Sequence, residues 1–231
     1  MKEVYFLLLE AGMSEFVLYS YFRSSASYRV RIALNLKKLS YEYKAVHLLK
    51  NGGEQHDPEY RKLNSIAQVP TLIHNGRPIA QSMAIIEYLD LLFPQPALFP
   101  RDPYQRAQVI QACEIVNSGV QPLHNSSILQ KLGTEFKADE AAKNAWTAFY
   151  IRQGLEALEL FLKPLAAEFS FGKTVSAADC FMMPNFANAE RFNVPLRDYP
   201  TLFRIHATCS ELDAFKKAGP KVQPDTPPEF K

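Results

Sequence analysis

The sequence predicts a mixed α/β domain followed by an all-helical domain. Strand-like and helix-like segments alternate up to residue 93, a cluster of prolines follows, and every later periodic segment has helical spacing. At 231 residues, the chain has room for two domains of ordinary size. We therefore expect an N-terminal extension at 1–15, an α/β domain at 16–93, a linker at 94–104 and a helical domain with a tail at 105–231.

The α/β domain is expected to open with a strand, a helix and a parallel strand. The apolar run 16–21 has strand character, and Val30, Ala33 and Leu34 begin a helical repeat that ends near residue 38. Residues 41–47 alternate and are rich in aromatic and β-branched side chains. Because the two strands are joined by a helix, we expect them to be parallel.

The same domain is expected to close with a hairpin and a helix. Asn75-Gly76 separates two short strand-like runs and suits the positive φ angles of a tight turn. A helical segment follows over residues 82–92.

Prolines separate this domain from the helical one, since proline disrupts both helices and central strands. They occupy positions 94, 96, 100 and 103. Beyond them, helices are predicted over residues 105–132, 139–168, 176–190 and 201–218. The extension at 1–15 and the proline-rich residues 220–231 are expected to be poorly ordered or draped over the surface.

Composition favours a small-molecule partner over nucleic acid or a membrane. The formal net charge is only +2 and no long basic run occurs. The early apolar run, residues 4–9, is too short for a signal sequence or a membrane span. The five histidines lack metal-ligand spacing, so no metal is expected. Cys113, Cys180 and Cys209 lack a disulfide or metal pattern, which favours buried free thiols and a cytoplasmic location.

The segment between the first strand and the first helix identifies the family. Residues 21–34 read YFRSSASYRVRIAL, and this run resembles the signature of zeta-class glutathione transferases. Further motifs similar to that family are NSIAQVPTL at 64–72, QSMAIIEYL at 81–89, QPLHN at 121–125, NAERF at 188–192 and QPDTP at 223–227. The resemblance covers residues 16–227. It implies a glutathione transferase fold, in which a thioredoxin-like domain binds glutathione and a helical domain follows, and it implies a homodimer.

The resemblance also implies an activity. Zeta-class enzymes of the maleylacetoacetate isomerase kind convert a small maleyl dicarboxylate, maleylacetoacetate, into fumarylacetoacetate during aromatic amino acid catabolism, by reversible addition of the glutathione thiolate. Ala26 stands where the usual signature has cysteine, and Tyr28 replaces the more usual tryptophan or histidine. These departures leave maleylpyruvate open as the substrate. A general transferase or dehalogenase, and a noncatalytic interaction protein of the same fold, remain alternatives.

Ser24 and Ser25 have two interpretations. A serine between a strand and a helix ordinarily caps the helix through its hydroxyl. The resemblance implies instead that Ser24, with Ser25 beside it, donates to the glutathione sulfur at the helix N-terminus, where the partial positive charge favours a thiolate.

Other residues are assigned to glutathione by the resemblance. Val69 precedes Pro70, a proline that is cis in thioredoxin-like folds and that lets the backbone of the preceding residue pair with glutathione. Gln81 and Ser82 begin a helix whose free N–H groups suit a carboxylate. The remaining members of this set are Gln55, Gln121, Asn125 and Ser127.

Arg29 and Arg191 are the candidates for holding substrate carboxylates, because a guanidinium binds carboxylates in bidentate fashion. Arg29 is also assigned to catalysis, as a cation that stabilises a developing enolate. Taken alone, Arg191 is a surface ion-pair partner. Ser176 and Asp179 form a variant capping box, so Asp179 is interpreted as structural. His124 either tunes the substrate pocket or has no role.

Overall fold

A computed structural model describes residues 16–231, so the expected extension at 1–15 lies outside the described residues. The chain divides into two compact units. The first runs up to Pro96 and also includes Ala214–Lys231, and the second is Ala97–Asp213. Residues 214–231 therefore fold with the α/β unit and not with the helices that precede them.

The first unit is built on a four-stranded sheet with the strand order β2-β1-β3-β4. Strand β1 pairs in parallel with β2 and antiparallel with β3, which confirms the expected crossover. Strands β3 and β4 form the predicted hairpin, with φ angles of 50° at Asn75 and 72° at Gly76. The strands are β1 (Phe16–Ser20), β2 (Tyr41–Ala45), β3 (Thr71–His74) and β4 (Arg77–Ala80).

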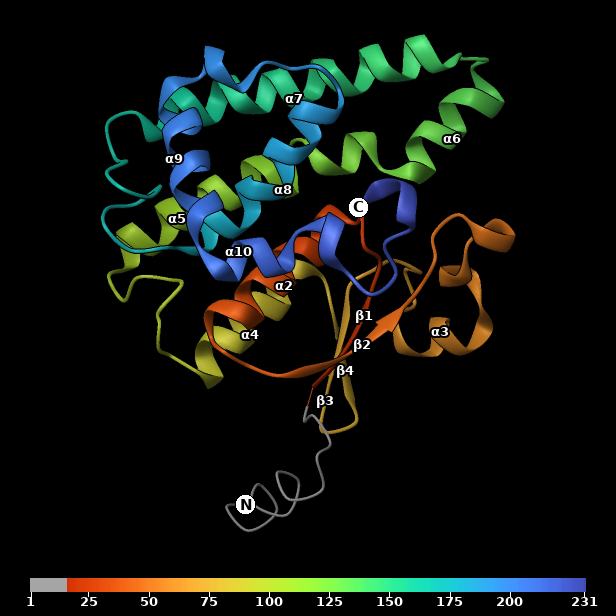
Figure 1. The fold of residues 1–231 in the computed structure, drawn as a ribbon, viewed down its shortest axis with the longest axis horizontal. Helices are drawn as coiled ribbons and strands as arrows, with labels where there is room; N and C mark the ends of the chain where they lie inside the picture. Colours follow the sequence, from red (N-terminus) through yellow and green to blue (C-terminus); the bar gives the residue numbers. More distant parts are fainter. Residues whose placement is uncertain (1–15) are drawn as a thin grey trace. The chain divides into compact units, whose positions relative to one another are not determined.

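Helices cover both faces of this sheet. Helices α2 (Ser25–Leu36) and α4 (Ser82–Leu92) pack together on one face, and α3 (Pro58–Leu63) lies on the other (Figure 1). The sequence predicts no helix at α3, yet Asp57 caps its start by accepting from the Glu59 N–H at 2.8 Å. Two short 3₁₀ turns, η1 (Lys50–Gly52) and η2 (Glu54–His56), precede it.

The second unit consists of helices that pack around α8 and α7. The single helix predicted over 105–132 is wrong, because η3 (Gln121–His124) interrupts it between α5 and α6. Pro122 lies in that interruption, and a proline inside a helix removes a donor and clashes with the carbonyl four residues before it. The helices are α5 (Pro103–Asn117), α6 (Ser126–Glu135), α7 (Glu140–Leu162), α8 (Ala177–Arg191) and α9 (Pro200–Glu211), with η4 (Leu196–Asp198) before α9.

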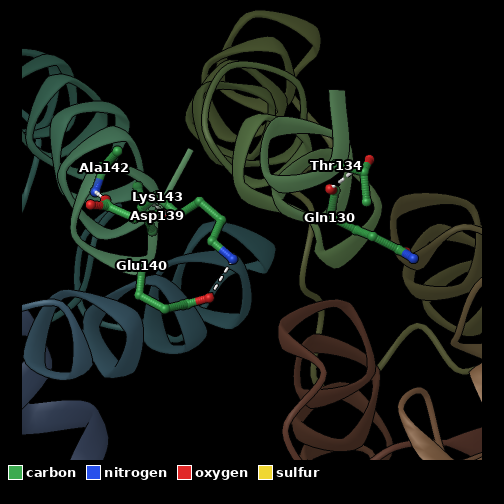
Figure 2. Close-up of polar contacts among 7 residues, drawn as sticks. Gln130, Thr134, Asp139, Glu140, Ala142 and Lys143 are labelled. Atoms are coloured by element: carbon green, nitrogen blue, oxygen red, sulfur yellow. Dashed lines mark hydrogen bonds and ion pairs between the residues drawn. The ribbon is translucent and has the colours of Figure 1, made fainter. Parts of the chain in front are cut away.

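The corner between α6 and α7 shows how these helices begin and end (Figure 2). Asp139 caps α7 by accepting from the Ala142 N–H at 2.8 Å, and Lys143 pairs with Glu140 one turn later. Near the end of α6, the Thr134 hydroxyl donates to the Gln130 carbonyl at 3.1 Å. The Asp139 cap satisfies a backbone N–H that a helix start leaves without a partner, whereas the Thr134 hydroxyl adds a donor to a carbonyl within its own helix.

The C-terminal segment is folded onto the first unit. The helix predicted over 201–218 breaks at Leu212, and the segment continues as α10 (Asp213–Ala218), η5 (Pro220–Val222) and η6 (Pro228–Phe230). Asn35 of α2 donates to the Ala214 carbonyl at 2.9 Å, and Figure 1 shows the segment, in blue, beside α2. The expectation of a poorly ordered or draped tail is wrong, because long-range hydrogen bonds fix it.

Two kinds of feature, a membrane-spanning helix and a cluster of metal ligands, are absent from the described residues. Between residues 16 and 231, no helix is both long enough and apolar enough to cross a membrane. Within the same range, no three His, Cys, Asp or Glu side chains are placed to hold a metal ion together.

Candidate functional site

Strand register brings four separate segments to one end of the sheet. Ser20, the last residue of β1, pairs with Ala45, the last residue of β2, so the chain leaves both parallel strands at the same end. The antiparallel strand β3 begins at this end, since Thr71 lies opposite both Tyr19 of β1 and Ala80 of β4.

The candidate residues of the first unit follow directly from these strand ends. The loop 21–24 continues β1, and η2 with Gln55 continues the chain after β2. Residues 69–70 precede β3, and residues 81–82 follow β4. The sheet therefore collects all four predicted glutathione segments of this unit.

Ser24 is the N-cap of α2. Its backbone is extended, with φ −70° and ψ 119°, and its Oγ accepts from the Ser27 N–H at 3.2 Å. A hydroxyl that accepts one hydrogen bond keeps its own hydrogen for donation. The first turn of α2 has no acidic residue, so the partial positive charge of the helix end is not neutralised locally. Both interpretations of Ser24, cap and donor to a sulfur, are compatible with this geometry, and Ser25 follows it as the first helical residue.

Arg31 supports the loop that carries Ser24. Its side chain is fully buried in α2, and its Nη2 donates to the Phe22 carbonyl at 3.0 Å. Its Nη1 donates to the Ser20 hydroxyl at 3.1 Å and lies 3.3 Å from the Tyr21 carbonyl. Burial lowers the pKa of the guanidinium, but arginine stays charged in proteins. The charged side chain of Arg31 thus holds residues 20–22 in place from helix α2.

Helix α3 supports the segment before β3. The Tyr60 hydroxyl donates to the Gln68 carbonyl at 2.5 Å, and Asn64 Nδ2 donates to the same carbonyl at 2.7 Å. The peptide bond between Val69 and Pro70 is cis, as the family resemblance implies. Burial raises the pKa of Tyr60 and so keeps its hydroxyl protonated. The periodicity of the sequence does not predict this helix, but a local signal for its start is present. Asp57 is a cap residue, and Pro58 follows it at the first helical position.

The start of α4 is held by Arg29. Gln81 is its N-cap with φ 72°, and no side chain caps this end of the helix. Arg29 Nη1 donates to Ser82 Oγ at 3.1 Å. Both residues are buried, with Arg29 1% and Ser82 3% exposed. The geometry assigns Arg29 an internal partner at the predicted carboxylate site, and it leaves the Ser82 hydroxyl hydrogen available for donation.

Gln55 presents an acceptor from a nearly buried position. The residue is 9% exposed, and within the described residues its Oε1 has no hydrogen-bond partner. Gly53, at φ 105°, makes room for it, because a Cβ at Gly53 would lie 2.4 Å from Gln55 Nε2. A buried acceptor of this kind costs stability unless a donor reaches it, so it fits a peptide ligand with N–H groups.

The second unit holds the remaining candidates. Gln121 Nε2 donates to Asn125 Oδ1 at 2.6 Å, so the structure brings these two side chains together. Ser127 is exposed in the first turn of α6, and the Arg191 guanidinium lies 5.0 Å from the centroid of the Phe192 ring at the end of α8.

Asp179 has the structural role expected of it. Its carboxylate accepts from the backbone N–H groups of Ser176 and Ser170, at 2.8 and 3.0 Å. The residue is fully buried, and burial raises the pKa of its carboxyl group. It joins the start of α8 to the preceding loop.

Comparison with known proteins agrees with this geometry. Residues 14–91 match the family described as glutathione S-transferase, N-terminal domain. Maleylacetoacetate isomerase from Mus musculus is 44% identical over 93% of this chain and 97% of that protein. A holo structure of maleyl pyruvate isomerase, described as a bacterial zeta-class glutathione S-transferase, has a TM-score of 0.88 and 43% identity, covering 91% of this chain and all of that one. The chain belongs to the zeta class of the glutathione transferases.

Another relative has been solved with ligands. Two crystal structures of maleylacetoacetate isomerase from Anaeromyxobacter dehalogenans 2CP-1 have TM-scores of 0.82 and 0.81, at 42% and 41% identity, over 92% of this chain and 98% of each of those chains. One holds glutathione in its active site, and the other holds dicarboxyethyl glutathione and citrate. The zeta-class assignment therefore rests on sequence and fold over nearly the whole chain.

Proposed function

We propose that this zeta-class protein is a glutathione-dependent isomerase that converts maleylacetoacetate into fumarylacetoacetate in tyrosine catabolism. The observation that carries the proposal is the geometry of Ser24, whose hydroxyl accepts from its own helix and keeps a hydrogen to donate at the helix N-terminus. The names of the relatives from Mus musculus and Anaeromyxobacter support the substrate. Bound glutathione would supply a thiolate nucleophile, whose addition to the cis double bond leaves a single bond that can rotate, and elimination of the same thiolate then restores the double bond in the trans form.

Ser24 lowers the pKa of the bound thiol in this proposal. Lowering a thiol pKa from about 8.5 to about 6.5 requires about 2.7 kcal/mol. A partly buried helix terminus contributes up to about 2 kcal/mol, and a hydrogen bond to a charged group contributes about 1.5 to 3 kcal/mol. The two effects available at Ser24 suffice without a basic side chain.

The other segments at this end of the sheet hold the tripeptide. The N–H groups at the start of α4 and the Ser82 hydroxyl bind the γ-glutamyl carboxylate, and Arg29 orients Ser82 from behind. The Val69 backbone pairs with the peptide of glutathione, and Gln55 Oε1 accepts a hydrogen bond from one of the N–H groups of glutathione. Direct contacts of Gln121, Asn125 and Ser127 with glutathione remain predictions. The roles of Arg29 and Arg191 toward substrate carboxylates, and of Arg29 toward a developing enolate, also remain predictions.

Maleylpyruvate is a second candidate substrate. Ala26 replaces the signature cysteine, and the holo maleyl pyruvate isomerase resembles this chain as closely as the maleylacetoacetate isomerases do. The two substrates share the maleyl group, so the glutathione site is the same for both. Discrimination between them lies in residues that contact the rest of the substrate.

The deciding experiment compares turnover of maleylacetoacetate and maleylpyruvate at saturating glutathione, together with a pH titration of thiolate absorbance in the glutathione complex. We expect a bound thiol more acidic than free glutathione and a higher kcat/KM for maleylacetoacetate. A preference for maleylpyruvate would exchange the two candidates. A bound thiol as basic as free glutathione, without turnover of either substrate, would favour the noncatalytic alternative.

We further propose a cytoplasmic homodimer. Cys113, Cys180 and Cys209 are all free and buried, which suits a reducing compartment. Zeta-class membership supports a two-fold dimer in which the α/β domain of one subunit faces the helical domain of its partner. Light scattering at micromolar protein is expected to give twice the mass of the chain, and a monomer mass would contradict the dimer.

A further inference from the structure

The QPDTP motif at 223–227 contacts the loop that carries Ser24. Asp225 Oδ2 accepts from the Phe22 N–H at 2.9 Å, and Asp225 Oδ1 accepts from the Tyr43 hydroxyl at 2.6 Å. Phe22 is two residues before Ser24, although it is 203 residues away from Asp225 in the chain. Both carboxylate oxygens are therefore used on the α/β unit.

Asp225 is itself held in a compact turn. Gln223 Nε2 donates to the carbonyls of Lys217 and Gly219, at 3.0 and 2.7 Å. The Thr226 hydroxyl donates to the Pro220 carbonyl at 2.6 Å. Gln223 and Thr226 are both buried, so hydrogen-bonded and buried side chains flank Asp225 in the chain.

The two ends of the Phe22 residue are fixed by different charged groups. Asp225 accepts its N–H, and Arg31 donates to its carbonyl at 3.0 Å. The same Arg31 donates through Nε to the Ala218 carbonyl at 2.9 Å, so it joins the loop to the C-terminal segment. The Phe22 ring is buried, 5.6 Å from the Phe230 ring. The bond to the Phe22 N–H and one contact of its ring therefore come directly from the C-terminal segment, and the bond to its carbonyl comes from an arginine that also holds that segment.

Fixing Phe22 fixes the direction of Ser24. The Ser24 N–H donates to the Tyr21 carbonyl at 3.0 Å, so residues 21–24 form a closed turn whose orientation follows from its central peptides. A hydroxyl acts on a sulfur only if it points toward it, because a hydrogen bond weakens steeply away from linearity. Burial and the bond to Asp225 raise the pKa of Tyr43, so the second partner of Asp225 stays a donor at neutral pH.

We propose that Asp225 is a positioning residue for thiol activation, through which the C-terminal segment 214–231 sets the orientation of the Ser24 hydroxyl. The inference rests on the proposed function, since thiol activation is the property it explains. It predicts that a substitution in the C-terminal segment changes the pKa of a thiol bound at the start of α2.

The test compares Asp225→Ala and Asp225→Asn with two controls, Glu229→Gln and Asn35→Ala. Glu229→Gln neutralises an exposed carboxylate of the same segment. Asn35→Ala removes a different bond to the segment, the one to the Ala214 carbonyl, without touching Phe22. For each protein, the pKa of bound glutathione, its Kd, kcat/KM and Tm are measured.

Asp225→Ala is expected to raise the pKa of the bound thiol by about one unit and to lower kcat/KM about tenfold, which corresponds to about 1.4 kcal/mol. Asp225→Asn retains an acceptor for the Phe22 N–H and is expected to lower kcat/KM only about threefold, or about 0.65 kcal/mol. Asn35→Ala is expected to lower Tm while the thiol pKa stays unchanged, and Glu229→Gln is expected to change neither.

The outcomes separate the inference from the proposed function. If the unsubstituted protein does not acidify the bound thiol, the proposed function fails. The positioning role is overturned if the unsubstituted protein acidifies the thiol but both Asp225 variants keep its thiol pKa. It is also overturned if Asn35→Ala shifts the thiol pKa as much as Asp225→Ala does. Should Asp225→Ala not fold, Asp225→Asn decides alone, and an unchanged thiol pKa in that variant overturns the inference.

Discussion

The two groups of predicted glutathione residues differ in how firmly they are held. At the sheet end of the first unit, Ser24 lies in a turn fixed by the buried Arg31, and Ser82 accepts from the buried Arg29. In the second unit, the half-buried Gln121 donates to the half-buried Asn125, so each of these side chains is held by another uncharged side chain. Similar polar residue types therefore stand on supports of different rigidity. We infer that the first group sets the chemistry of the bound thiol and that the second adjusts the affinity for glutathione.

The largest effect is expected from Arg31→Met. The substitution leaves the carbonyls of Phe22 and Ala218 buried without their charged donor. Because each buried acceptor without a partner costs about 1 to 3 kcal/mol, we expect a loss of about 3 to 5 kcal/mol in the free energy of unfolding. Denaturant unfolding measures it, with the exposed Arg61→Met in α3 as a control that changes little. A loss below about 1 kcal/mol would mean that the sheet end is not rigidly held.

Ser24→Ala is expected to have the largest effect on chemistry alone. Loss of a hydrogen bond to a charged sulfur, about 1.5 to 3 kcal/mol, corresponds to a decrease in kcat/KM of about 10-fold to 150-fold. Loss of the helix cap is expected to lower the free energy of unfolding by about 1 kcal/mol as well. Ser25→Ala serves as the matched control, because Ser25 is helical and does not accept from the Ser27 N–H.

The same pair of variants has a pH signature. The thiolate is the reactive form, so activity falls as pH drops through the pKa of the bound thiol. Ser24→Ala raises that pKa, and the acidic limb of the profile of kcat/KM is therefore expected to move to higher pH. Ser25→Ala is expected to leave the limb in place. Identical profiles for the two variants would reduce both serines to helix caps.

A smaller effect is expected from Gln121→Ala and Asn125→Ala. Each is expected to raise KM for glutathione about twofold to fivefold, or about 0.4 to 1 kcal/mol, with kcat unchanged. Because the two side chains bond to each other, the double variant is expected to cost less than the sum of the single variants. A loss in kcat as large as that of Ser24→Ala would erase the difference between the two groups.

Local patterns in the sequence predict much of this molecule. Asn75-Gly76 places the hairpin, and the bounds of α4 agree with the periodicity of residues 82–92. Each of these features is decided by residues within a few positions of one another. The start of α2 at Ser25 follows in the same way from the cap residue before it.

Long-range contacts are what the sequence conceals. Arg31 and Ala218 are 187 residues apart, and no local signal joins them. For the same reason Arg29 and Arg31, two residues apart in one helix, look alike in sequence, yet one contacts Ser82 and the other contacts the loop. The sequence therefore does not predict which residues support the site, although the family resemblance identifies the candidate donors.

The smallest effect on turnover is expected from Ala26→Cys. Ala26 is half-buried in the first turn of α2, next to the position where a thiolate is stabilised. The native chemistry does not require a protein thiol there, so we expect kcat/KM to change by no more than about twofold, or about 0.4 kcal/mol. The new cysteine, at a helix N-terminus, is expected to be reactive toward electrophiles.

Intact-protein mass spectrometry after turnover separates these two expectations. The native cysteines are all buried, and burial raises the pKa of Cys209, so a single adduct in Ala26→Cys is attributable to the new residue. The unsubstituted protein is expected to stay unmodified through many turnovers. If Ala26→Cys instead raised kcat/KM by several hundredfold, the helix end would be incomplete without its thiol. Ser24 would then not be the sole determinant of chemistry at the sheet end, and the native chain would be a repurposed member of the class.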